Sequence, residues 1–200
     1  LGYVLRDNTD LNAAVSLYCD FYNALTSSGG AGSLKEHIVD RVLGDENPFT
    51  LHCELSGGNT PFDEAAALDL FHLQRVARLP SALVKERIRK GCSPDQASLE
   101  VLNSLPGWES FSMLPVDPSL PYGRIKNTLM GSESWKDCLL QLSMFHRQNG
   151  SGIFALYRAF VWESDGKHGF LRGIDNPDPV SLSDLVGYND QKAAVLGNTL

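Results

Sequence analysis

The stretch SWKDCLLQLSMFHRQNG, residues 134–150, shows the pattern that recurs through most of this chain. It begins with a serine that can cap a helix and ends with a glycine, the residue that most often follows a helix. Between them apolar residues return every three or four positions, which is typical of a helix with one buried face. The residues expected on that face are Trp135, Cys138, Leu139, Leu142 and Phe145.

Similar start and stop signals predict two helices in the N-terminal part of the chain. Asp10 precedes a pattern of helical period that the glycine-rich stretch 27–32 ends. Ser33 and Glu36 have the spacing of a capping box, in which each side chain can accept a hydrogen bond from the other residue's backbone N–H. Gly44 closes the helix that this box predicts.

Prolines mark the boundaries of the next segments. Pro48 disfavours helical backbone at Asn47, so residues 47–49 are predicted to form an extended or turning step. Thr60 and Pro61 then form a start signal, because proline is favoured at the first helical position. The residues expected on the apolar side of that helix are Leu68, Phe71, His72, Val76 and Leu79.

Three further helices are predicted between residues 80 and 131. Pro80 separates a helix capped by Ser81 from the one before it, and residues 93–96 repeat the proline start signal. Residues 106–121 are proline-rich but carry large apolar side chains, which predicts a packed loop. A short helix containing Ile125 follows.

The period changes near residue 158. The stretch RAFVWESDGKHGFLRGI, residues 158–174, alternates around an Asp-Gly pair, which predicts a β-hairpin with Phe160 and Trp162 on one side. Residues 175–179, DNPDP, then read as a stiff linker. The expected fold is mainly α. Its predicted domains are a helical domain, residues 1–150, a hairpin segment packed on it, residues 151–175, and a new beginning, residues 176–200.

Composition limits the functional classes. With 42% hydrophobic and 20% charged residues in 200, the chain is globular, and its net charge of −7 argues against nucleic acid as a partner. No run of 18 apolar residues predicts a membrane span. The four cysteines lie far apart without a CxxC pair, so we expect reduced thiols in the cytoplasm or an organelle interior. Because the first residue is Leu1, an upstream targeting segment stays open.

The last twenty residues, SLSDLVGYNDQKAAVLGNTL, resemble the entry into the nucleotide-binding domain of AAA+ ATPases. More narrowly, they resemble a family of uncharacterised predicted AAA+ ATPases with a signature shortly before a GxxxxGK phosphate loop. The matching residues are Asp184, Leu185, Val186, Gly187, Tyr188, Gln191, Lys192, Asn198 and Thr199. The Gly-x-Gly at 150–152 and the AFVW at 159–162 also match features of that family.

The resemblance implies a nucleotide site that only begins in this chain. In AAA+ proteins the loop before the first helix packs against adenine, which assigns that role to Leu185, Val186, Gly187 and Tyr188. ATP and Mg²⁺ are the implied cofactors of the full-length protein. Residues 1–200 contain neither GxxxxGK followed by Ser or Thr nor an apolar strand ending in paired acids, so we expect no ATP hydrolysis by this chain alone.

A basic segment, residues 75–90, stands out from an acidic chain. Six cations against Glu86 give a local charge of +5. They are Arg75, Arg78, Lys85, Arg87, Arg89 and Lys90. Two interpretations are open: a docking surface for an acidic partner, or a solvated face whose cations complement the C-terminal end of a helix.

Two functional hypotheses follow. The first is a non-catalytic helical region of an AAA+ ATPase, serving partner docking, subunit contact or regulation; its partners would be a downstream ATPase domain, further copies of the chain or an unidentified protein. The second is a stand-alone helical interaction module with no nucleotide role. An independent active site is not expected, because the neighbours His52, Cys53 and Glu54 cannot converge as a triad.

Overall fold

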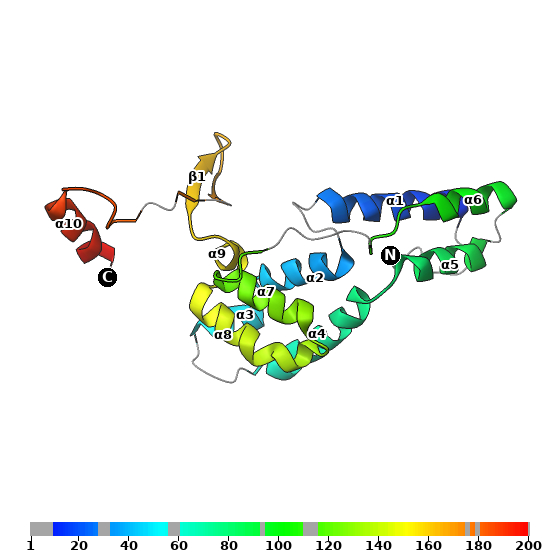
Figure 1. The fold of residues 1–200 in the computed structure, drawn as a ribbon, viewed down its shortest axis with the longest axis horizontal. Helices are drawn as coiled ribbons and strands as arrows, with labels where there is room; N and C mark the ends of the chain where they lie inside the picture. The colour runs from blue at the N-terminus through cyan, green and yellow to red at the C-terminus, as the bar shows by residue number, and fades with distance from the viewer. Residues whose placement is uncertain are drawn as a thin grey trace. The chain divides into compact units, whose positions relative to one another are not determined.

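The computed structural model describes residues 10–27, 33–55, 61–92, 95–109, 116–174, 177–178 and 181–199. Contacts within the chain divide it into two units, Leu1–Leu156, called here the helical unit, and Tyr157–Leu200, called the hairpin unit. As the sequence predicts, the described residues are mainly helical and carry one small antiparallel hairpin (Figure 1).

The elements follow one another with short connections. The described helices of the helical unit are α1 (Leu11–Ser27), α2 (Leu34–Leu43), α3 (Pro48–Leu55), α4 (Asp63–Ala77), α5 (Ser81–Cys92), α6 (Gln96–Ser104), α7 (Pro121–Gly131), the 3₁₀-helix η1 (Trp135–Cys138), α8 (Leu139–Asn149) and α9 (Gly152–Leu156). The hairpin unit contains β1 (Phe160–Ser164), β2 (Gly169–Gly173) and α10 (Asn189–Thr199).

The first two predicted helix starts are confirmed, with one correction. Asp10 Oδ2 accepts from the Ala13 N–H at 3.0 Å, and Ser33 Oγ accepts from the Glu36 N–H at 3.2 Å. The predicted return bond from Glu36 is wrong, because its carboxylate is buried beside Lys126 instead.

A helix that the sequence did not predict begins at Pro48, so the expectation of an extended step there is wrong. Proline at the first helical position loses no hydrogen bond, because the N–H groups of that turn have no helical partner. Asn47 supplies the cap: its Oδ1 accepts from the Thr50 N–H at 3.1 Å, and Thr50 Oγ1 accepts from the Asn47 N–H at 2.9 Å.

Two other predicted caps are replaced by different groups. α6 is capped by Asp95, whose Oδ1 accepts from the Ser98 N–H at 2.8 Å. Ser81 is the first residue of α5 rather than its cap, and both its backbone N–H and its hydroxyl donate to the carboxylate of Glu109. Several predicted features lie outside the described residues: the glycine-rich loop at 28–32, Thr60, Ser93–Pro94, residues 110–115, and the linker residues 175–176 and 179–180.

The buried apolar residues of the helical unit form two clusters. The larger one joins α2, α3, α4, α7, η1 and α8, and the smaller one joins α1, α5 and α6 around Trp108. Ile38 packs against both clusters. Trp108 is buried, as predicted for the proline-rich loop, and its indole N–H donates to the Leu79 carbonyl at 3.0 Å.

The predicted buried face of residues 134–150 is confirmed. The sequence forms a 3₁₀ turn that continues directly into α8. Four of the expected residues are buried and Leu139 is partly buried; the four are Trp135, Cys138, Leu142 and Phe145. Gly150 ends α8 with a φ of 83°, a left-handed conformation that glycine adopts without strain.

The predicted apolar side of α4 is wrong. Leu68 is 56% exposed and Phe71 41% exposed, whereas the buried residues of this helix are Leu70, Gln74 and Ala77. Apolar residues occupy every side of α4, so their spacing does not select one face. The selection comes from a polar residue.

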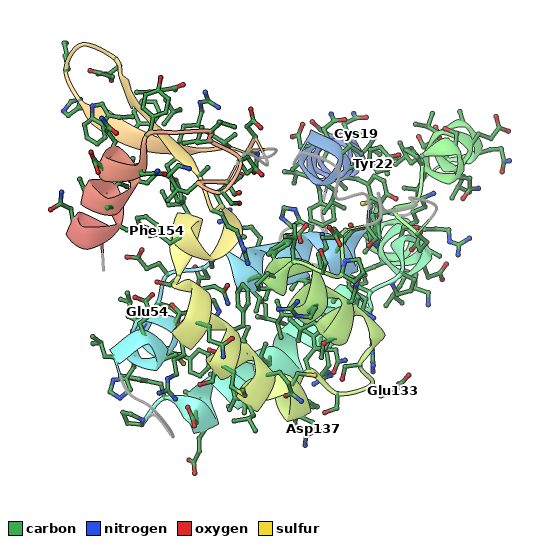
Figure 2. All side chains as sticks on the ribbon, turned by 60° about the vertical axis from the view of Figure 1, so that its left-hand side comes forward. Cys19, Tyr22, Glu54, Glu133, Asp137 and Phe154 are labelled. Atoms are coloured by element: carbon green, nitrogen blue, oxygen red, sulfur yellow. The ribbon has the colours of Figure 1, made fainter. Side chains whose placement is uncertain are left out.

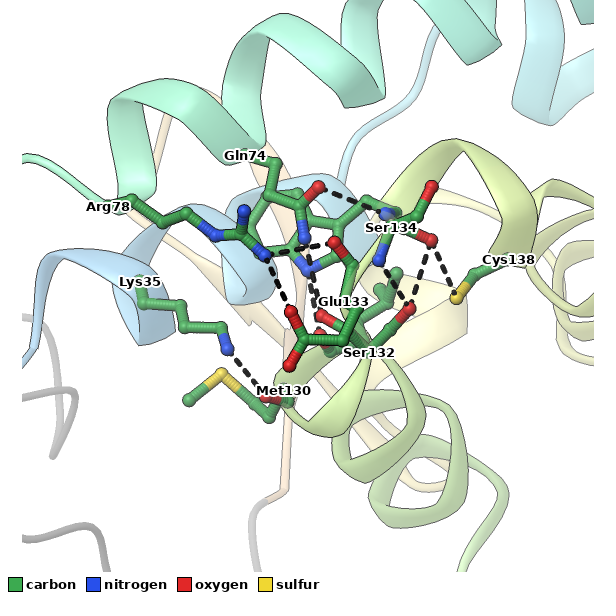
Figure 3. A network of polar contacts seen from close by, with 10 residues as sticks. Lys35, Gln74, Arg78, Met130, Ser132, Glu133, Ser134 and Cys138 are labelled. Carbon is green, nitrogen blue, oxygen red and sulfur yellow. Dashed lines mark hydrogen bonds and ion pairs between the residues drawn. The ribbon is translucent and has the colours of Figure 1, made fainter.

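Gln74 fixes the rotation of α4 against the segment that precedes α8. Its amide N–H donates to the Ser132 carbonyl at 3.3 Å, and its amide oxygen accepts from the backbone N–H of Trp135 at 3.2 Å (Figure 3). Trp135 is itself anchored, because its indole N–H donates to the Leu129 carbonyl at 2.7 Å. Both bonds of Gln74 satisfy backbone groups near the start of η1 that its helix leaves unpaired.

A buried charge cluster joins α2 to α7. Lys126 Nζ lies 2.6 Å from Asp40 Oδ1 and 3.5 Å from Glu36 Oε1, and both Lys126 and Glu36 are almost fully buried. The Tyr122 hydroxyl donates to Asp40 at 2.5 Å. Burial raises the pKa of Glu36 above its ordinary value of 4.5, even though the neighbouring ammonium of Lys126 opposes the shift.

The hairpin is confirmed between residues 158 and 174. Trp162 pairs with Leu171, and the turn is held by Asp165, whose carboxylate accepts from the backbone N–H groups of Lys167 and His168 at 2.8 and 2.7 Å. Gly169 has no room for a side chain: a Cβ there would lie 1.9 Å from the indole of Trp162.

Replacing Gln74 tests the anchor of α4. Gln74→Ala leaves the Trp135 N–H and the Ser132 carbonyl buried without partners, so we expect the free energy of unfolding to fall by about 2–3 kcal/mol. The exposed Gln141→Ala on α8 should change it by less than about 0.5 kcal/mol. Urea denaturation of both variants measures the difference, and equal stability in the two would contradict the anchor.

The charge cluster predicts opposite results for two of its members. Lys126→Met leaves two carboxylates without their cation, and we expect a loss of about 3–5 kcal/mol. Glu36→Gln keeps the Lys126–Asp40 pair and removes a carboxylate that burial disfavours, so stability at pH 7 should not fall.

The pH dependence has a defined sign. The folded-state pKa of Glu36 is raised, so this group adds stability below the unfolded pKa of about 4.3 and loses that contribution as the pH rises through the folded value. The stability of the wild type relative to Glu36→Gln should therefore decrease from pH 4 toward pH 7. A relative increase would show that Glu36 is ionised at no cost.

Candidate functional site

A turn and a glycine-tyrosine step precede α10. The turn at residues 181–184 is closed by Asp184, whose Oδ2 accepts from the Ser181 N–H and hydroxyl, each at 2.7 Å. These hydrogen bonds, the hydroxyl one first, hold the pKa of Asp184 below its ordinary value. The loop therefore enters α10 from a defined turn.

Gly187 and Tyr188 both have left-handed backbone conformations, with φ values of 82° and 57°. Glycine adopts this region freely, but a tyrosine does so rarely. α10 begins at the next residue, and Lys192 ties its first turn back to the loop: its backbone N–H donates to the Tyr188 carbonyl at 2.9 Å, and its ammonium donates to the Leu185 carbonyl.

The apolar side chains of this loop face solvent. Val186 is 94% exposed, Tyr188 70% and Leu185 is also exposed. A Cβ built on Gly187 meets nothing within 4 Å, so a ligand can approach the backbone there closely. The four residues that the resemblance assigns to adenine, Leu185 to Tyr188, thus lie together in one exposed loop. Such a loop can contact a planar ring and bond its edge through backbone groups.

The six cations of the basic segment contact separate partners. Arg75 lies over the Phe71 ring, 5.9 Å from its centroid. Arg78 lies 3.7 Å from the Glu133 carboxylate and donates to the Glu133 carbonyl at 2.9 Å (Figure 3). These two contacts belong to the α4 end of the segment.

The other four cations lie on α5. The Lys85 ammonium donates to the Leu105 carbonyl and lies 5.9 Å from the centre of the Tyr18 ring. Arg89 and Lys90 pair with Glu86, the latter at 3.3 Å, and Arg87 is exposed. Local partners therefore account for most of the segment, and its role as a docking surface stays a prediction.

A groove that the sequence analysis missed lies beside α4; we call it the α4 groove. Its volume is about 590 Å³. Its lining residues are Val42, Asp45, Asn47, Pro48, Phe49, Thr50, Phe62, Ala65, Ala66, Asp69, Leu70, His72, Leu73 and Leu142. They come from α2, α3, α4 and α8 and the adjoining turns, so spacing within one helix gives little sign of it. The available signal was the spacing of Phe62, Ala66, Asp69 and Leu73 on one side of α4.

The residues His52, Cys53 and Glu54 do not converge. His52 stacks on Phe62 with ring centres 5.8 Å apart, Cys53 Sγ donates to Ser143 Oγ at 3.3 Å, and Glu54 (labelled in Figure 2) accepts from Ser151 at 2.5 Å. Three neighbours in sequence thus contact three different elements, as expected for residues that form no triad.

His146 on α8 is fully buried. Its Nδ1 lies 3.0 Å from the Gly150 carbonyl, and burial lowers its pKa below the ordinary value of 6.5. A neutral imidazole that donates to this carbonyl helps to end α8, which is a structural role. Across the described ranges, no three His, Cys, Asp or Glu side chains gather as metal ligands, and no helix has the length and apolarity to cross a membrane.

No family model, curated protein or solved structure matches the chain. Its function is therefore argued from its own residues and geometry.

Proposed function

We propose that this chain is the helical, non-catalytic region of an AAA+ ATPase, together with the loop that begins the nucleotide-binding domain. The observation that supports this most is the conformation at Gly187 and Tyr188, directly before α10. The resemblance of residues 181–200 to an AAA+ entry segment is carried by the same residues.

The loop has the properties that an adenine contact requires. Adenine has a flat apolar face and an edge of hydrogen-bonding groups. Leu185 and Val186 provide exposed apolar surface, and Gly187 provides backbone that no side chain covers. Contact with adenine would bury the apolar area that the loop exposes, at about 25 cal/mol for each Å² removed from water.

This chain's own residues would hold only the base. Binding of the β- and γ-phosphates and of Mg²⁺ requires a phosphate loop and acidic metal ligands. The resemblance places these after residue 200. When bound, ATP and Mg²⁺ supply the phosphoryl-transfer chemistry, whereas residues 185–188 orient the base.

The helical unit would then serve partner docking, subunit contact or regulation of that ATPase core. Its described features favour such a role over chemistry, because the buried His146 and the dispersed trio at residues 52–54 form no reactive cluster. A stand-alone interaction module is the alternative.

Substitution of Gly187 tests the adenine loop in a protein that contains residues 1–200 and the ATPase domain. Gly187→Val forces a β-branched residue into a left-handed conformation, so we expect the affinity for ATP to fall about tenfold or more. Gly197→Val is the matched control, because a Cβ at Gly197 also meets nothing within 4 Å but its helical backbone is ordinary. Isothermal titration measures both, and circular dichroism checks that the helices remain.

Equal ATP affinity in the two glycine variants would contradict the loop assignment. The coding sequence gives a second test that needs no protein. Continuation into GxxxxGK followed by Ser or Thr, shortly after the codon for Leu200, is expected; a stop codon there would favour the stand-alone module.

A further inference from the structure

The α4 groove combines an apolar floor with acidic edges. Its floor contains Phe49, Leu70 and Leu142, all buried, and its walls contain the exposed side chains of Phe62 and Leu73. Grooves of this kind, apolar with a few placed polar groups, are the usual binding surfaces of helical proteins.

The charges in the groove are of one sign. Asp45 and Asp69 line it, and no Lys or Arg is among its lining residues. The start of α3, which could otherwise attract an anion, is already satisfied, because Asn47 accepts the Thr50 N–H. Asp69 is exposed and makes no ion pair within the described part of the chain, so it is available to a cation.

The groove continues along α4 as a stripe. Phe62, Ala66, Asp69, Leu73 and Val76 follow one another at spacings of three and four, so they lie on one side of the helix. The fifteen residues of α4 extend over about 22 Å at the rise of an α-helix. A surface of that length fits an elongated occupant better than a compact molecule.

The opposite side of α4 is different. Leu68, Phe71 and Arg75 lie there, and Arg75 covers the Phe71 ring at 5.9 Å. An apolar side chain on that side therefore offers a control at a similar degree of exposure but away from the groove.

We propose that the α4 groove binds an amphipathic helix of a partner protein, with apolar side chains against Phe49, Leu70 and Leu73 and with Lys or Arg beside Asp45 and Asp69. The apolar residues of the partner supply the affinity, and the carboxylates select a basic partner over an acidic one. This inference does not depend on the nucleotide loop, which belongs to the other unit of the chain.

A designed peptide tests the proposal on the full 200-residue chain. The probe is a fluorescein-labelled 18-residue helix with Leu at spacings of three and four and Lys elsewhere. Fluorescence anisotropy should show saturable binding to the wild type, and a second peptide with Ser in place of every Leu should not bind.

Paired variants locate the site. Leu73→Ser and Asp69→Lys should each weaken binding about tenfold, or about 1.4 kcal/mol, because they remove an apolar wall and an acidic edge. Leu68→Ser, on the opposite side of α4, and Asp137→Lys, at an exposed carboxylate of η1 (Figure 2), should stay within about twofold of the wild type. Circular dichroism checks folding of all four.

Three outcomes would overturn the proposal. These are no saturable binding by the wild type, equal binding of the Ser peptide, and equal losses in Asp69→Lys and Asp137→Lys. The last would mean that the peptide responds only to the net charge of −7. A fall in ATP affinity on Gly187→Val in the longer protein would be unaffected by any of them.

Discussion

The hydrogen bonds of Gln74 determine how the helical unit uses α4. One amide group satisfies the carbonyl of Ser132 and the N–H of Trp135, two backbone groups that are buried once α4 is in place. Only one rotation of the helix allows both bonds. That rotation buries Leu70 and Ala77 and directs Leu73 and Asp69 toward the α4 groove. The groove therefore follows from a polar contact rather than from the apolar pattern of the helix.

Sequence reasoning succeeded where the controlling interactions are local. The caps at Asp10 and Ser33, the end at Gly150 and the hairpin turn at Asp165 all involve residues within four positions of each other. It failed on the face of α4, because the partners of Gln74 lie 58 and 61 residues away. It also read Pro48 as a break, although Asn47 and Thr50 cap the helix that starts there.

The two candidate sites differ in the same way. The loop at residues 185–188 is contiguous, so a local signature could predict its residues, and the left-handed φ of Gly187 gives that signature a physical basis. The α4 groove is assembled from residues between Val42 and Leu142 on four helices and the turns beside them. No spacing in the sequence predicts such a surface, because its existence depends on which side of α4 is buried.

Nuclear Overhauser contacts to the backbone amide of Trp135 test this account most directly. If Gln74 sets the rotation of α4, the side-chain amide protons of Gln74 should show a contact to the Trp135 amide proton, while the methyl groups of Leu68 should show none. Contacts from Leu68 or Phe71 to that amide would mean that α4 is rotated toward its other apolar side, and the α4 groove would not exist.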